Sequence, residues 1–326
     1  MSEQEAANAA PRSDVRAGVP AVALLLYRKQ TRLIATTLLH AVNEATAELG
    51  ETFELVEAMD DRRFALAGHT HHIVVEDSAE PLGKDALASA LAHPFVDTVF
   101  PAARAIALGH GAHTRITVAA GPVPANDAAL DMDALELADF EPENVLPRLR
   151  LLRAATHAFT RQRFPLAVHW CQSDNLLAGP EFVQMAERGV ETELFVKAVP
   201  YCESGDDGNL YGAVTSGAAN VIGREVELAG APVQPAWAAD RLLQFVEKAR
   251  TGVPAAGEAL RFPTDEIVLV HDEPASPVFP AGHVKLTVEK LPPSATSGDG
   301  AAPDGATIGF LNEMEKRAAG RAFGRR

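Results

Sequence analysis

A histidine, a cysteine and an aspartate gather in the segment VHWCQSD at positions 168–174. The apolar residues before it predict a strand, whose alternation places His169 and Cys171 on one face and Trp170 on the other. A neighbouring imidazolium favours the thiolate form of cysteine, so His169 and Cys171 could form a nucleophile pair, with Asp174 in the polar segment that follows. The alternative is that Cys171 is inert packing, because the spacing identifies no third group that would orient the histidine.

A second group of candidate residues lies in the turn GHGAH, between an apolar helix and a strand. Gly109 and Gly111 can both adopt positive φ and end the helix, which would leave His110 at the negative end of the helix dipole, where a protonated imidazole is favoured. His110, His113 and Trp170 are the predicted ligand-binding residues. The two histidines are also weak candidates for a metal, since a metal site needs three or four convergent ligands. A structural role for the pair is the alternative.

The motifs of the common enzyme classes do not occur in this sequence. It has no P-loop, no dinucleotide-binding fingerprint after a strand, no nucleophile elbow and no zinc-protease helix. We therefore predict no metal and no cofactor.

Composition sets broader limits on the partners. The 326 residues, 47% of them hydrophobic, suffice for two domains with cores of their own. A net charge of −15 argues against nucleic acid and anionic membranes as partners, because phosphate contacts need clustered Lys and Arg. The longest apolar run near the start, 19–27, is too short to span a bilayer. Two cysteines and no signal peptide lead us to expect a cytoplasmic protein of unknown oligomeric state.

The order of the expected elements divides the chain into two α+β lobes. Residues 1–18 form a lead-in, and in the first lobe, 19–121, the expected order is strand, helix, strand, strand, helix, strand, which is the ferredoxin-like split βαβ pattern. Prolines and a run of acidic residues predict a linker over 122–143. The second lobe, 144–291, begins like the first. We expect two ferredoxin-like lobes packed as a pseudo-dimer.

The hydrophobic periodicity and the turn residues give the expected bounds of the elements. The expected strands are 21–27, 53–58, 64–67 or 72–76, a strand from His113 onward, 166–170, 193–199, 211–216, 221–228, 266–271 and 283–289. The expected helices are 31–49, 84–108 with interruptions at Pro94 and Pro101, 143–163, 179–188 and 236–251. The outer face of helix 143–163 is expected to carry Arg148, Arg150, Arg153 and Arg161.

Several of these segments together resemble an uncharacterised bacterial family, a domain of unknown function. The resemblance covers about residues 20–290 and rests on VALLLY, HGAHTRITV, VHWCQSDNLLAGPEF, LFVKAVPY, GAVTSGAANVIGREVEL and GHVKLTVEK. In that family a histidine pair recurs near His110 and His113, a tryptophan near Trp170 and a glycine-led strand near 223–228. The resemblance implies a bacterial cytoplasmic protein and supplies no activity.

The last segment, 292–326, differs from the rest of the chain. Residues 292–305 have the composition of a flexible linker, and a basic amphipathic tail follows. Its predicted partner-binding residues are Ile308, Phe310, Leu311 and Met314. We expect a binding or scaffold protein that contacts a protein partner through this tail. The alternative is a metal-binding protein or a hydrolase-like enzyme with a site at the histidine-bearing turn.

Overall fold

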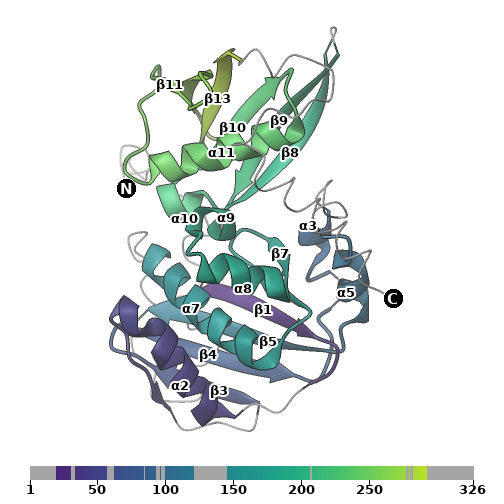
Figure 1. The fold of residues 1–326 in the computed structure, drawn as a ribbon, viewed down its shortest axis with the longest axis vertical. Helices are drawn as coiled ribbons and strands as arrows, with labels where there is room; N and C mark the ends of the chain where they lie inside the picture. Colours follow the sequence, from purple (N-terminus) through teal and green to yellow (C-terminus); the bar gives the residue numbers. More distant parts are fainter. Residues whose placement is uncertain are drawn as a thin grey trace, which may run out of the picture. The chain divides into compact units, whose positions relative to one another are not determined.

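A computed structural model describes residues 20–30, 34–56, 62–83, 85–92, 96, 100–120, 145–205, 208–276, 279 and 282–291. The chain is a mixed α+β protein with two sheets, as predicted, and it divides into two compact units at the peptide between Lys197 and Ala198 (Figure 1). In the described residues, none of the helices combines the length and the apolar character needed to cross a bilayer.

The first unit, residues 20–197, is built on a sheet of seven strands in the order β2-β3-β4-β5-β1-β6-β7. Each pair of neighbours is antiparallel. The strands are β1 (Ala21–Tyr27), β2 (Glu54–Leu55), β3 (Arg63–Ala67), β4 (His71–Ser78), β5 (Ala112–Ala120), β6 (Ala167–Trp170) and β7 (Asn175–Ala178).

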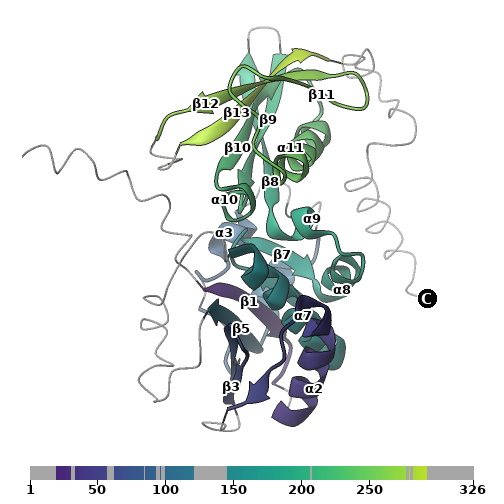
Figure 2. The same cartoon turned by 90° about the vertical axis from the view of Figure 1, so that its left-hand side faces the viewer.

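Helices cover both faces of this sheet. They are α2 (Ala35–Thr46) with the 3-10 turn η1 (Ala47–Leu49), α3 (Ala88–Leu91), α5 (Ala103–Gly109), α7 (Val145–Arg163), α8 (Gly179–Glu187) and α9 (Glu191–Phe195). Helices α2, α7 and α8 lie on one face in both views (Figures 1 and 2). On the other face, Leu87 and Ala103 of the α3 and α5 region pack with Leu26, Ala167 and Leu176 in one apolar cluster.

Strand β1 is the centre of the first sheet. It pairs with β5 on one side and β6 on the other, and six of its seven residues are buried. The sequence AVALLLY carries apolar side chains on both faces, as a strand covered by helices on both sides requires. Complete burial of Leu25 and of Leu26 stabilises the fold by roughly 2 kcal/mol each.

The predicted domain boundary at 122–143 is wrong. Strands β5 and β6 both run antiparallel to β1, so they are parallel to each other, and the chain between them contains α7. This is a split βαβ unit, which places α7, β6 and β7 in the first sheet. The acidic, proline-containing composition of the segment marks a connection within one unit, since the helix after it returns to the same sheet. Residues 121–144 lie outside the described part of the chain.

The second unit, whose described residues lie within 198–291, contains a sheet in the order β11-β12-β13-β10-β9-β8. Strands β10 and β13 are parallel, and the pairs β9–β10, β11–β12 and β12–β13 are antiparallel. The elements are β8 (Lys197–Gly205), β9 (Gly208–Ser216), α10 (Ala219–Ile222), β10 (Glu225–Ala231), α11 (Pro235–Ala249), β11 (Ala259–Arg261), β12 (Ile267–Glu273) and β13 (His283–Lys290). Helix α11 packs on β9 and β10 with Leu242, Phe245 and Val246 fully buried.

Two local predictions also differ from the structure. The expected strand 193–199 begins as helix α9, because Val196 N–H closes a helical turn on the Thr192 carbonyl and Phe195 is buried against Trp170. Arg148 of α7 is only 2% exposed, although its position in the sequence placed it on the outer face. The expected helix 84–108 contains two shorter helices, α3 and α5. The segments 64–67 and 72–76, which were alternatives for the strand after 53–58, both lie in strands, β3 and β4.

Candidate active site

The polar segment Cys171–Asp174 is the turn of a hairpin between β6 and β7. The two strands pair from Ala167 with Ala178 to Trp170 with Asn175, so the four turn residues close directly onto the strand ends. The Asp174 N–H donates to the Cys171 carbonyl across the turn at 3.3 Å. Asp174 has φ of 54°, in the left-handed region that aspartate tolerates better than most residues. The turn therefore brings Asp174 back beside the end of β6.

Alternation along β6 separates Trp170 from its neighbours, as predicted. Trp170 is fully buried and stacks on Phe182 and Phe195, with ring centroids 6.2 and 5.5 Å apart. His169 pairs with Leu24 and Leu176, on the face covered by the α3 and α5 region. Trp170 is thus a core residue of the opposite face, and the predicted ligand-binding residue does not meet His169 and Cys171.

The imidazole of His169 contacts both of the other candidate residues. Its Nε2 lies 2.8 Å from Oδ1 of Asp174, and its Nδ1 lies 3.8 Å from Sγ of Cys171. His169 is 5% exposed, and the Asp174 side chain is 24% exposed. Cys171 is partly exposed and free. One face of this turn thus carries a thiol, an imidazole and a carboxylate, with the imidazole between the other two groups and in contact with both.

The contacts of the His169 imidazole set the charge of the site. Burial alone would lower the pKa of His169, but hydrogen bonds to Asp174 and Cys171 outweigh it and raise the pKa to about 9. Burial would raise the pKa of Asp174, but hydrogen bonds with His169 and Ser89 hold it below its usual value. At neutral pH the pair is an imidazolium and a carboxylate. An imidazolium beside a thiol stabilises the thiolate.

Two residues that the sequence did not single out complete the surroundings of the turn. Ser89 of α3 bonds the Asp174 carboxylate, and Lys197 donates to the Asp174 backbone carbonyl at 2.9 Å. Burial lowers the pKa of Lys197, and the Asp174 charge opposes this shift. A hairpin turn of four residues ending in aspartate is the sequence signal that could have identified Asp174 as the partner of His169, because such a turn returns the chain to the preceding strand.

No protein-family model, curated protein or solved structure matches this chain. The resemblance to the bacterial family stays a prediction.

The histidine-bearing turn is held by the backbone. The Leu82 N–H donates to Nε2 of His110 at 2.8 Å, which requires a lone pair on that nitrogen, and Nδ1 of His110 donates to the Ala107 carbonyl at 2.8 Å. Both nitrogens of a neutral ring are then used, contrary to the protonated imidazole expected at this helix end. His113 donates from Nδ1 to the Glu80 carbonyl at 2.9 Å. The two rings fasten the segment around 80–82 to the start of β5.

The glycines of this turn act differently from the prediction. Neither Gly109 nor Gly111 is among the residues with positive φ, and His110 between them is extended. A Cβ on Gly111 would lie 2.7 Å from the Arg28 carbonyl oxygen, whereas a Cβ on Gly109 would meet nothing within 4 Å. Gly111 is required by the close approach of two backbones. Within the described residues, no group of three or more His, Cys, Asp or Glu side chains could hold a metal.

A buried polar cluster at the end of β1 was not predicted. Asp77, with its side chain 3% exposed, accepts from Arg163 at 2.9 Å, from Thr114 at 2.5 Å and from Gln30 at 2.9 Å. The Arg163 guanidinium also lies 4.6 Å from the centre of the Tyr27 ring. With this many partners the Asp77 carboxylate is satisfied and has no acceptor left for chemistry. The cluster joins β1, β4, β5 and α7.

A second buried carboxylate holds the turn between β3 and β4. Glu51 accepts from the N–H groups of His69 and Thr70, from the Thr70 hydroxyl, and from Nδ1 of His71 at 3.1 Å. Burial would raise the pKa of Glu51, but the hydrogen bonds lower it to about 2. This group stabilises a turn.

The predicted partner-binding residues Ile308, Phe310, Leu311 and Met314 lie outside the described residues.

Proposed function

We propose that the hairpin turn is the active site of a thiol-dependent enzyme of the acyl-transfer class, with Cys171 as nucleophile, His169 as acid and base, and Asp174 as the carboxylate that orients His169. The observation that carries the proposal is the single imidazole that contacts the Cys171 thiol with one nitrogen and the Asp174 carboxylate with the other. This is the arrangement that an activated nucleophile needs. The site differs from the predicted one at the histidine-bearing turn, where both nitrogens of His110 are bonded to backbone.

The chemistry follows from the proton positions. The Cys171 thiolate attacks a carbonyl carbon and forms a C–S bond, and the His169 imidazolium gives its proton to the leaving group as the carbonyl–leaving group bond breaks. Water then attacks the thioester and His169 accepts the proton of the water. The C–S bond breaks, which releases a carboxylic acid and regenerates the Cys171 thiolate beside the His169 imidazolium. Asp174 keeps the ring oriented and stabilises its positive charge.

The first test uses the two cysteines of the chain, because exposed Cys202 is an internal control. The ratio of the iodoacetamide alkylation rate at pH 6 to the rate at pH 9 is measured for each cysteine by peptide mass spectrometry. We expect a ratio at least tenfold higher for Cys171 than for Cys202, and a ratio near that of Cys202 in the variant His169→Gln. Because each ratio compares a cysteine with itself at two pH values, the different exposure of Cys171 and Cys202 does not affect the comparison. Equal ratios for the two cysteines in the unmodified protein would overturn the proposal.

The second test asks for acyl transfer itself. With p-nitrophenyl acetate we expect a burst of about one equivalent of nitrophenol per chain, and an acetyl group on Cys171. The variant Cys171→Ser should lose the burst, whereas Cys202→Ser should keep it. A burst that persists in Cys171→Ser, or acetylation confined to Cys202, contradicts the assignment. If Cys171 reacts rapidly with iodoacetamide but no burst is seen, the turn stabilises a thiolate without acyl transfer, and the proposed enzyme activity is rejected.

A binding or scaffold role, with a protein partner at the tail, is the second candidate function. It is favoured by a polar sheet face of the second unit, on which Glu203 and Glu289 are exposed. We also propose a cytoplasmic location, which the two free thiols support, and a ferredoxin-like arrangement of the first unit, which the split βαβ unit of β5, α7 and β6 supports. Affinity isolation from the native cell, with and without residues 292–326, tests the binding role.

A further inference from the structure

The second sheet has one face that α11 covers and one face that is polar. Strand alternation and register place Val226, Leu228, Val284 and Leu286 together, all at most 2% exposed, on one face. The other face, which we name the acidic face, carries Tyr201, Glu203, Glu227, Glu273, Lys285 and Glu289. Glu203 and Glu289 are exposed and the other four are half-buried. This set has four carboxylates and one ammonium, and the same registers also place Arg261, His271, His283 and Lys290 on this face.

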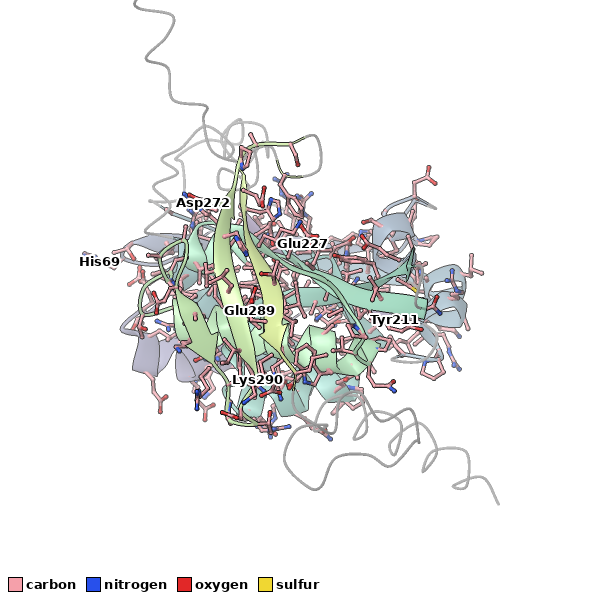
Figure 3. All side chains as sticks on the ribbon, turned by 90° about the horizontal axis from the view of Figure 1, so that it is seen from above. His69, Tyr211, Glu227, Asp272, Glu289 and Lys290 are labelled. Carbon is pink, nitrogen blue, oxygen red and sulfur yellow. The ribbon has the colours of Figure 1, made fainter. Side chains whose placement is uncertain are left out.

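The centre of the acidic face is fixed by hydrogen bonds. Tyr201 of β8 donates to Oε1 of Glu227 at 2.9 Å, and Nε2 of His283 lies 2.9 Å from Oε2 of the same carboxylate. Tyr201 reaches β10 across Gly212 of β9, where a Cβ would come within 2.4 Å of the tyrosine ring. Figure 3 shows Glu227 and Glu289 on their strands. The central charge of the acidic face is therefore held at a fixed position.

The same chain contains a segment of opposite charge. Residues 316–326 read KRAAGRAFGRR, with five cationic side chains and no acidic one, in a protein whose net charge is −15. The apolar residues Ile308, Phe310, Leu311 and Met314 precede it. On the acidic face, Val214 lies opposite Glu227 and Leu269 opposite Thr287, and both are half-buried, so apolar area is available beside the charges.

The length of the connection matches the size of the sheet. Strand β13 ends at Lys290 in this sheet, and 17 residues, 291–307, separate it from Ile308, the first of the apolar residues that precede the basic segment. A flexible chain of that length has a root-mean-square reach of about 23 Å. Six strands at a spacing of about 4.8 Å place the outermost strands about 24 Å apart. The tail can therefore reach any part of the acidic face at an effective concentration in the millimolar range.

We propose that the acidic face is the docking surface for the chain's own segment 308–326, which covers Glu227 and Tyr201 when it is bound. Charge complementarity, the tether from β13 and the apolar residues beside the carboxylates all point to this occupant. Docking of this kind would compete with any basic partner for the same face. The proposal stands independently of the thiol chemistry at Cys171.

A zero-length cross-link tests the docking directly in the full chain. Lys316 is the only lysine in 308–326, so a carbodiimide can join its amine only to carboxylates in contact with it. We expect amide links from Lys316 to Glu203, Glu273 or Glu289, found within one chain when ¹⁴N- and ¹⁵N-labelled protein are mixed. The variant Lys316→Gln provides the matched control. Links only to carboxylates elsewhere, links only between chains, or no link at all would overturn the proposal.

A second measurement does not depend on the position of one lysine. In the full-length triple variant Arg321→Glu, Arg325→Glu and Arg326→Glu, carbodiimide labelling of Glu203, Glu273 and Glu289 with a small amine should rise at least twofold. Raising the salt to 1 M should have the same effect on the unmodified protein, because the Debye length falls to about 3 Å. Exposed Glu48 of the first unit serves as the control carboxylate. Unchanged labelling of the three glutamates would contradict the docking.

Discussion

The carboxylate of Asp174 lies 2.8 Å from Nε2 of His169 while the Asp174 backbone is left-handed, with φ of 54°. The ion pair therefore holds a backbone conformation that costs about 1 kcal/mol or more for a residue with a side chain. In the proposed enzyme the pair serves both the stability of the turn and the chemistry of Cys171. Variants at either position need readouts that separate the two roles.

Replacement of His169 by Gln should change how stability depends on pH. The folded-state pKa of His169 is raised to about 9 against an ordinary value of 6.5, so its contribution is fully present below pH 6.5 and is lost as the pH rises through 9. We expect the unmodified protein to lose up to about 3 kcal/mol more than His169→Gln between pH 6 and pH 9.5. Urea unfolding across this range measures the difference. Parallel curves for the two proteins would show that His169 is not protonated in the fold.

Replacement of Asp174 by Asn should separate orientation from charge. Asparagine tolerates the left-handed backbone and can still accept from Nε2 of His169, so the melting temperature should change little. Loss of the negative charge removes one of the causes that raise the pKa of His169. We expect the alkylation rate of Cys171 at pH 6 to fall about tenfold, because less of the imidazolium that favours the thiolate is present. An unchanged rate would mean that Asp174 only positions the turn.

Arg163 and Arg161 form a matched pair on α7. Arg163→Met leaves the Asp77 carboxylate buried without its cation and should cost about 3–5 kcal/mol in the free energy of unfolding. Arg161→Met removes an exposed ion pair with Glu187 and should cost at most about 0.5 kcal/mol. Chemical unfolding of both variants gives the comparison. Equal costs would contradict the buried cluster at Asp77.

Gly111 and Gly109 form a second pair, one on each side of His110. Gly111→Ala brings a Cβ within 2.7 Å of the Arg28 carbonyl oxygen and should destabilise the protein by about 1–3 kcal/mol. Gly109→Ala meets open space at the end of α5 and should be neutral or stabilise by up to about 1 kcal/mol. Thermal unfolding distinguishes the two. Similar melting temperatures would show that the backbones at Gly111 can separate easily.

Sequence patterns were sufficient where the signal is local. The apolar run 21–27 predicted a strand with both faces buried, and the periodicity of 143–163 predicted the helix that became α7. The alternation that separated His169 and Cys171 from Trp170 also held. In each case the deciding information lies within a few residues, because side-chain direction in one strand or helix follows from its period alone.

Features that depend on distant segments could not be predicted. The boundary near 122–143 was wrong because the pairing of Leu26 with Ala167 joins residues far apart in the chain. His110 was treated as a ligand candidate because its donor and acceptor, the Leu82 N–H and the Ala107 carbonyl, are backbone groups that no motif encodes. The role of Asp174 was missed because strand β7 was not expected, and without that strand no hairpin returns Asp174 to His169.

The central position of β1 has a consequence for how the protein folds as the ribosome makes it. The strand is among the first described residues, but its neighbour β5 starts at Ala112 and its other neighbour β6 at Ala167, which is 140 positions after Tyr27. At about 5–20 residues per second, the ribosome needs roughly 7–30 s to add the segment that completes the pairing. During that interval the apolar heptapeptide AVALLLY has at least one edge unpaired, so it is the segment of the nascent chain on which a chaperone would act.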